Sequence, residues 1–234
     1  MSVSPKEACF EDVRLRILRV ELAPGAVLDE ASLASHYGLS RTPLREVLQR
    51  LSGAGYITLK EHRGAKVASM DIVTMRTFFQ TAPMVYANIG RLAAENRTDA
   101  QLDALQDTQL RFATQTQAGD AAAAALSNHR FHAVIGEMAQ NPYLVASLNR
   151  LLIDHTRLSQ TFYRPRNASD EALVRQACRQ HEALISALQA QETERVVDLT
   201  LQHWDLSRDS MERFVRPDPL PVDLPSPKER YDAI

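Results

Sequence analysis

Four side chains that can hydrogen-bond to DNA bases or phosphates lie within a single short stretch of the chain. They are Arg41, Thr42, Arg45 and Gln49. On an α-helix, with about 100° between successive residues, all four gather on one flank. In a major groove an arginine offers two donors to guanine, and a glutamine offers a donor and an acceptor to adenine. The spacing favours a DNA-recognition helix over the alternative, an ordinary surface helix whose arginines are solvated.

A buried stripe on the same segment would hold this helix against the rest of the protein. Its apolar residues follow the i, i+3, i+4, i+7 spacing of a buried helix face, at Leu44, Val47, Leu48 and Leu51. We expect Ser40 to cap the helix and Pro43 to lie in its first turn.

The flanking sequence predicts a turn before this helix and a hairpin after it. Residues 29–38 have a short helical pattern that ends at Gly38, which can adopt a positive φ and begin a tight turn. Residues 54–60 and 65–68 have the pattern of two short strands. The expected order is therefore helix, turn, helix and a basic hairpin wing.

With these elements in order, residues 11–69 resemble the winged helix-turn-helix of the GntR family of bacterial transcription regulators. The matching stretches are LAPGAVL at 22–28, SRTPLRE at 40–46 and RGAKV at 63–67. Some relatives carry a further DNA-contacting arginine in the preceding helix, where this chain has Ala31.

The resemblance implies a role for each matching residue. Arg41 and Arg45 would contact bases or phosphates, and Thr42 would contact a phosphate. Gly64 would let the wing approach the minor groove. The candidate DNA-binding residues are Arg41, Thr42, Arg45, Gln49, Arg50, Arg63 and Gly64.

The composition fits a two-domain protein with a weakly basic first part. The chain has 234 residues, 44% of them hydrophobic, and a net charge of −2. Residues 1–70 hold ten Lys and Arg against eight Asp and Glu, whereas residues 71–234 hold seventeen against twenty-one. Because the excess is small, DNA affinity should depend on a few placed arginines and on dimerisation.

Targeting and redox signals are sparse. Cys9 and Cys178 are too few and too far apart to suggest a disulfide framework. No long apolar run or signal-peptide pattern is present, so we expect a soluble cytoplasmic protein without a membrane partner.

After Met70 the sequence changes to an alanine- and leucine-rich helical periodicity. The expected helices lie near residues 71–96, 99–117, 120–139, 142–162, 169–190 and 193–214. Pro83 should kink the first of them or split it. The expected protein is mainly α. It has a winged helix-turn-helix domain over residues 1–70, an all-helical antiparallel bundle over 71–216, and a proline-rich tail over 217–234 that cannot continue a helix.

Histidines carry the potential chemistry of this bundle. Asn128 and His132 are four residues apart and project from one helix face. His181 lies on the helix expected over 169–190, and His203 follows it by 22 residues on the next helix. Antiparallel helices can bring such side chains level, and three imidazoles with one oxygen form a plausible metal shell. The alternative is that each histidine is simply hydrogen-bonded or solvated.

A second resemblance favours the metal site. Residues 71–214 resemble the FCD ligand-sensing domain of the FadR subfamily, with matching motifs at 131–132, 141–144 and 181–182. It implies that Asn128, His132, His181 and His203 bind a divalent metal that helps to hold a small carboxylate effector. Zinc is the favoured ion, with nickel and manganese as alternatives. Relatives usually have Asp where this chain has Asn128, and a neutral amide oxygen is a weaker ligand.

The effector contacts depart from the family pattern. Where many relatives carry an Arg and, four residues later, a Glu, this chain has Ala82 and Tyr86. The candidate effector-binding residues are therefore Tyr86, Arg130, Arg157 and Arg175. For the arginines the alternative is a surface or ion-paired role. His129 and His155 are spare candidates, with solvated or supporting roles as the simpler interpretation.

These features predict a homodimeric, metabolite-responsive transcription regulator, more often a repressor in this family, that binds a palindromic double-stranded operator. Two other classes remain to be weighed. A metal-dependent hydrolase would need a general base, and the nearest candidate, Glu182, points about 100° away from its neighbour His181. A ligand-independent DNA-binding protein would show no response of operator binding to small molecules.

Overall fold

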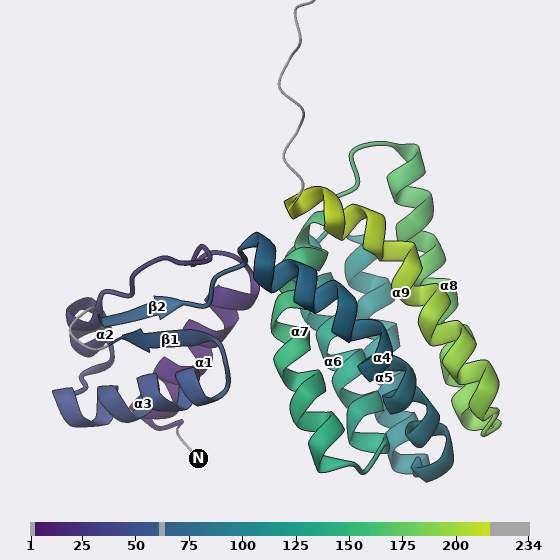
Figure 1. Cartoon of the computed structure of the whole chain (residues 1–234), viewed down its shortest axis with the longest axis horizontal. Coiled ribbons are helices and arrows are strands. Elements are labelled where there is room, and N and C mark those ends of the chain that lie inside the picture. Colours follow the sequence, from purple (N-terminus) through teal and green to yellow (C-terminus); the bar gives the residue numbers. More distant parts are fainter. Residues whose placement is uncertain (1–2, 61–63, 216–234) are drawn as a thin grey trace, which may run out of the picture.

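The computed structural model describes residues 3–60 and 64–215. The N-terminal part contains three helices and a two-stranded antiparallel sheet (Figure 1). In order these elements are α1 (Pro5–Leu18), α2 (Glu30–Tyr37), α3 (Arg41–Gly53), β1 (Ile57–Lys60) and β2 (Gly64–Val67). Both helices and the hairpin expected from the sequence are therefore present.

Local chemistry explains the turn between α2 and α3. The Asp29 side chain accepts a hydrogen bond from the Ser32 backbone N–H and starts α2. Gly38 ends it with a φ of 62°, the left-handed conformation that glycine adopts without strain. Ser40 occupies the cap position of α3, but its side chain makes no capping hydrogen bond, so the expected side-chain cap is wrong.

The predicted stripe of α3 is buried. Leu44, Val47, Leu48 and Leu51 are each at most 4% exposed and pack with α1 and the hairpin. In that hairpin Ile57 pairs with Val67 and Lys60 with Gly64. The Glu30 side chain accepts a hydrogen bond of 3.3 Å from the Ala65 backbone N–H, which ties α2 to the wing.

The C-terminal part is an all-helical bundle, as the sequence indicates. Its helices are α4 (Ile72–Asn96), α5 (Asp99–Gln117), α6 (Ala121–Met138), α7 (Pro142–Phe162), α8 (Ala168–Gln189) and α9 (Thr193–Val215). Side-chain caps at Asp71, Thr98 and Asp120 fix where α4, α5 and α6 begin. Helix α4 runs through Pro83 without interruption, so the helix is not split there. The proline-rich segment 217–234 lies outside the described residues.

Helix α7 is the part of the bundle that faces the N-terminal elements (Figure 1). Residues 152–160 of this helix are all buried, although most of them are polar. Ile153 packs into the core of the N-terminal part, and Gln160 Nε2 donates to the Leu18 carbonyl at 3.2 Å. Arg157, with no exposed surface, donates to the Ala68 carbonyl at 2.8 Å and pairs with Asp154. Helix α7 thereby joins the two parts of the molecule.

Helix length and polarity also bear on membrane insertion. Within the described part of the chain, no helix combines the length and apolar character needed to cross a bilayer.

Candidate nucleic-acid interface and metal centre

The exposed flank of α3 carries most of the predicted DNA contacts. Arg41, Thr42, Arg45 and Gln49 are all exposed. A groove runs beside them between α2, α3 and the wing, and its lining includes Arg41, Arg45, Lys60 and Gly64. Gly64 has a φ of 68° at the start of β2. The structure thus brings the helix side chains and the wing to one face; Arg63 falls outside the described residues.

Arg50 lies apart from this set. Its guanidinium pairs with Glu7 at 2.9 Å and lies 4.3 Å from the centre of the Phe10 ring. Both partners belong to α1, so Arg50 ties α3 to α1 from the edge of the helix away from Arg41. The sequence does not show these α1 partners, and a contact of Arg50 with DNA stays a prediction.

Three helices of the bundle bring their histidines together. His132 comes from α6, His181 from α8 and His203 from α9, and their ligand atoms all lie within 4.8 Å of one another. The Nε2 atoms of His181 and His203 are 3.2 Å apart. Two nitrogens bound to one tetrahedral zinc ion at about 2.05 Å would be about 3.3 Å apart. Asn128, one helical turn before His132, is 2% exposed.

Two glutamines fix which ring nitrogens are free. Nδ1 of His181 donates to the side-chain oxygen of Gln109 at 2.8 Å, and Nδ1 of His203 donates to that of Gln180 at 3.0 Å. The Nε2 atoms of both rings therefore present lone pairs to each other. Neither glutamine was predicted from the sequence. The one signal that could have indicated Gln109 is its place as a polar residue on the buried face of α5.

The three-histidine cluster contains buried polar atoms without hydrogen-bond partners, which favours a bound cation over a purely structural role. The side-chain oxygen of Asn128 and Nε2 of His132 are buried without a hydrogen-bond partner. Burial lowers the pKa of His203 to about 4 and the pKa values of His132 and His181 well below their usual value. All three rings are therefore neutral near pH 7, which is the form that binds a metal.

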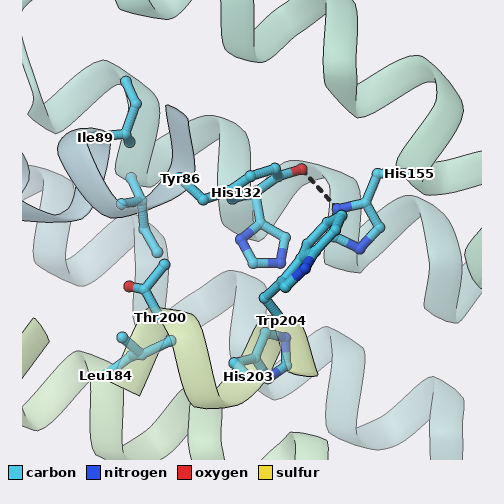
Figure 2. Close-up of a pocket in the computed structure, with 9 residues that line it drawn as sticks. Tyr86, Ile89, His132, His155, Leu184, Thr200, His203 and Trp204 are labelled. Carbon is cyan, nitrogen blue, oxygen red and sulfur yellow. Dashed lines mark hydrogen bonds between the residues drawn. The ribbon is translucent and has the colours of Figure 1, made fainter. Parts of the chain in front are cut away.

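A small cavity adjoins the histidines (Figure 2). It has a volume of about 20 Å³, the room of about one water molecule. Its walls are formed by Tyr86, Ile89, His132, Ile135, His155, Leu184, Thr200, His203 and Trp204. Tyr86 Oη lies 2.6 Å from His155 Nδ1, the contact drawn as a dashed line. Burial raises the pKa of Tyr86 and lowers that of His155 to about 3, so both side chains are neutral.

The candidate effector residues are not all brought to this cavity. Tyr86 lines it, whereas Arg130 pairs with Glu137 at 2.6 Å and Arg175 with Glu171 at 3.5 Å, both on the exposed surface. Arg157 is buried but turned toward Asp154 and the backbone of Ala68.

Of the two spare histidines, one lies at the cavity and one does not. His155 lines the cavity, whereas Nδ1 of His129 contacts the Thr156 hydroxyl at 2.8 Å. Thr200 and Trp204 also line the cavity and were missed by the sequence analysis. Glu182, weighed earlier as a general base, is exposed.

These elements define a DNA-binding transcription regulator with a separate helical sensor. The chain matches the family described as "Bacterial regulatory proteins, gntR family" over residues 5–67 and the FCD domain over residues 84–206. It therefore belongs to the GntR family and carries an FCD domain. Members of this family are transcription regulators and not enzymes, which excludes the hydrolase alternative.

Individual relatives agree with this assignment. The chain is 27% identical over 130 residues to the Nta operon transcriptional regulator of Aminobacter aminovorans, covering 55% of this chain but only 60% of that protein. It is 27% identical over 193 residues to the transcriptional repressor GlaR of Escherichia coli, covering 80% of this chain and 86% of GlaR. The solved structure of E. coli McbR/YncC superposes with a TM-score of 0.77 at 21% identity, covering 92% of this chain and all of that one, which shows the shared fold.

Proposed function

We propose that this protein is a metabolite-responsive repressor whose helical domain holds a divalent metal ion and a small carboxylate effector. The observation that carries the proposal is the convergence of His132, His181 and His203, together with the partnerless buried oxygen of Asn128 one helical turn before His132. A repressor is favoured because the relative GlaR is a transcriptional repressor. We assign the DNA-binding domain to residues 1–70, the sensing domain to 71–216 and the tail to 217–234.

The metal would be held by three imidazole nitrogens and the amide oxygen of Asn128. Zinc suits such a nitrogen-rich set, and nickel and manganese are the alternatives. When bound, the ion supplies a cationic centre for an anionic ligand. His132 and His203 both line the cavity, so a carboxylate in that cavity would reach the ion directly. Gln109 and Gln180 hold two of the rings in the tautomer that binds metal.

The DNA interface would use the exposed flank of α3 and the wing. Arg41, Arg45 and Gln49 would enter the major groove, Thr42 would contact a phosphate, and Gly64 would bring the wing close to the minor groove. One such module makes too few contacts for high specificity. We therefore propose a homodimer that reads a palindromic site with half-site centres about one helical turn apart.

Elemental analysis tests the metal site. Wild-type protein purified without chelator should carry about one divalent ion per chain. The triple variant His132→Ala, His181→Ala, His203→Ala should carry none, whereas the control His129→Ala, a neighbouring and partly buried histidine outside the triad, should retain it. An undiminished metal content in the triple variant would place the ion elsewhere.

Fluorescence anisotropy with labelled operator DNA tests the response. A small carboxylate should weaken operator binding by the metal-loaded protein and not by the triple variant. If no member of a carboxylate panel changes operator affinity, the protein is a ligand-independent DNA-binding protein, the remaining alternative.

A further inference from the structure

Three charged side chains of α7 form a cluster where the bundle meets the N-terminal part of the molecule. Arg150, Asp154 and Arg157 are spaced by about one helical turn, on the bundle helix that faces the N-terminal elements (Figure 1). Asp154 accepts from both arginines. Arg150 Nη1 lies 3.4 Å from its Oδ2 atom, and Arg157 Nη2 donates to its Oδ1 atom. Arg157 and Asp154 are buried and Arg150 is half-exposed, so the cluster runs from the surface into the junction.

Two of these side chains contact the backbone at the base of the wing hairpin. Arg157 Nη1 donates to the Ala68 carbonyl at 2.8 Å, directly after β2 ends. Arg150 lies against Gly55, between the end of α3 and the start of β1; a Cβ atom at position 55 would be 2.6 Å from Arg150 Cδ. The two contact points are themselves joined, because the Ala68 N–H donates to the Tyr56 carbonyl at 2.9 Å. Helix α7 therefore holds the base of the hairpin at two adjacent positions.

Buried charges at such a junction contribute more to geometry than to stability. An apolar pair of similar volume is often as stable as a buried ion pair, because it avoids the desolvation of two ions. Apolar contacts are also non-directional, whereas the hydrogen bonds of a guanidinium require a particular distance and angle. The hydrogen-bonded cluster thus selects one register of α7 against the hairpin base, where an apolar contact would allow several.

We propose that Arg150, held by Asp154, is a positioning residue for DNA binding. It fixes α3 and the wing relative to the bundle, and thereby sets the separation of the two α3 helices in a dimer. This inference rests on the homodimer of the proposed function and is independent of the metal site. A fixed separation should accept one spacing of the operator half-sites, since each added base pair moves one half-site by about 3.4 Å and turns it by about 35° around the DNA axis.

The spacing dependence of DNA binding tests the proposal. The probe is a fluorescent duplex selected from random DNA by the wild-type protein, remade with one or two base pairs inserted or removed between its half-sites. Anisotropy titrations use the full-length protein without added carboxylate. Wild-type protein should bind the selected spacing at least about tenfold more tightly than the two-base-pair variants, because both half-sites must be engaged together.

Arg150→Ala removes the contact with Gly55 and one partner of Asp154. It should bind the selected spacing about tenfold more weakly than wild type, since a loosely held second α3 has a lower effective concentration. It should also distinguish the spacings by about threefold or less, because the loosened domains can adapt to each of them.

Two further variants separate positioning from stability. Asn149→Ala alters the neighbouring exposed residue of α7 and should bind like wild type. The double variant Asp154→Leu, Arg157→Met keeps the junction filled with apolar side chains. It should therefore unfold at a temperature near that of wild type and still lose the spacing preference.

A duplex with a single half-site shows whether α3 itself is intact. Wild-type protein and Arg150→Ala should bind this duplex equally, because the positioning of α3 matters only when two half-sites are occupied together.

Three results overturn the inference: Arg150→Ala or the double variant keeps the wild-type spacing preference, Asn149→Ala loses it as well, or Arg150→Ala weakens binding to the single half-site as much as to the pair. The last result would make Arg150 a direct DNA contact. These results leave the homodimer standing. If wild-type protein binds one half-site as tightly as two, the proposed homodimer fails, and this inference fails with it.

Discussion

Replacing Arg157 with Met tests how much stability comes from the buried Arg157–Asp154 ion pair within α7 and from the hydrogen bond by which Arg157 ties α7 to the Ala68 carbonyl. The arginine has no exposed surface, its partner Asp154 is 4% exposed, and its Nη1 atom donates to the Ala68 carbonyl at 2.8 Å. Methionine fills part of the same space without charge. The substitution therefore leaves both the Asp154 carboxylate and the carbonyl without their buried partner.

The expected loss of unfolding free energy is about 3–5 kcal/mol, the usual cost of removing one member of a buried pair. Arg150 moderates the loss, since its Nη1 atom lies 3.4 Å from the other oxygen of Asp154. Because Arg150 is half-exposed, it replaces the lost partner only in part. Urea unfolding followed by Trp204 fluorescence measures the change.

A double variant distinguishes the ion pair from simple packing. Adding Asp154→Leu to Arg157→Met removes both charges and should recover most of the lost stability, because an apolar pair avoids the desolvation of two ions. A loss below about 1 kcal/mol for Arg157→Met alone would refute the reasoning, since exposed ion pairs contribute no more than that.

Three further changes have defined outcomes. Arg45→Ala should weaken operator binding, measured by fluorescence anisotropy, by about 1–3 kcal/mol if Arg45 reads a base. Arg50→Ala should mainly lower the stability of the protein, which thermal unfolding measures. Asn128→Asp should tighten metal binding by restoring a charged oxygen, which competition against a chelator measures. The metal-free protein should lose stability as the pH falls below about 6.5, because the histidines of the unfolded chain then bind protons that the folded protein excludes. The expected loss at pH 5 is about 2 kcal/mol for each of His155 and His203, whose pKa values are lowered to about 3 and about 4.

Each of these expectations can fail in a distinct way. Unchanged operator affinity in Arg45→Ala would mean that the recognition face is misassigned. Metal affinity unaffected by Asn128→Asp would exclude position 128 from the ion. A metal-free protein equally stable at pH 7 and pH 5 would mean that the buried histidines are solvated in solution.

The sequence predicts the helices of this protein well because their signals are local. The stripe from Leu44 to Leu51 and the turn at Gly38 depend on residues a few positions apart, so periodicity and backbone conformation are sufficient. The three clustered histidines were also named in advance, but their convergence followed from family resemblance and not from spacing alone. Their ligation is still a proposal.

The cavity and its supports were beyond sequence reasoning because tertiary packing decides them. Gln109 meets His181 from a helix 72 positions earlier in the chain, and no local pattern links them. Arg157 was considered as an effector ligand, although it is turned to the backbone of Ala68. The polar run at 152–160 resembles an exposed helix in sequence, yet every residue in it is buried.

Through this buried run, α7 contacts both α4 and the segment that leads into α4, so the connections form a closed loop. His155 contacts Tyr86 on α4, Arg157 holds the carbonyl of Ala68 two residues farther along α7, and α4 itself begins at Ile72, just after Ala68. Two residues on a helix are separated by about 3 Å along its axis, and a packed interior offers little slack over such a distance. The cavity wall at Tyr86 and the backbone at Ala68, which leaves the wing, are therefore rigidly connected through α7. A displacement of either one should displace the other.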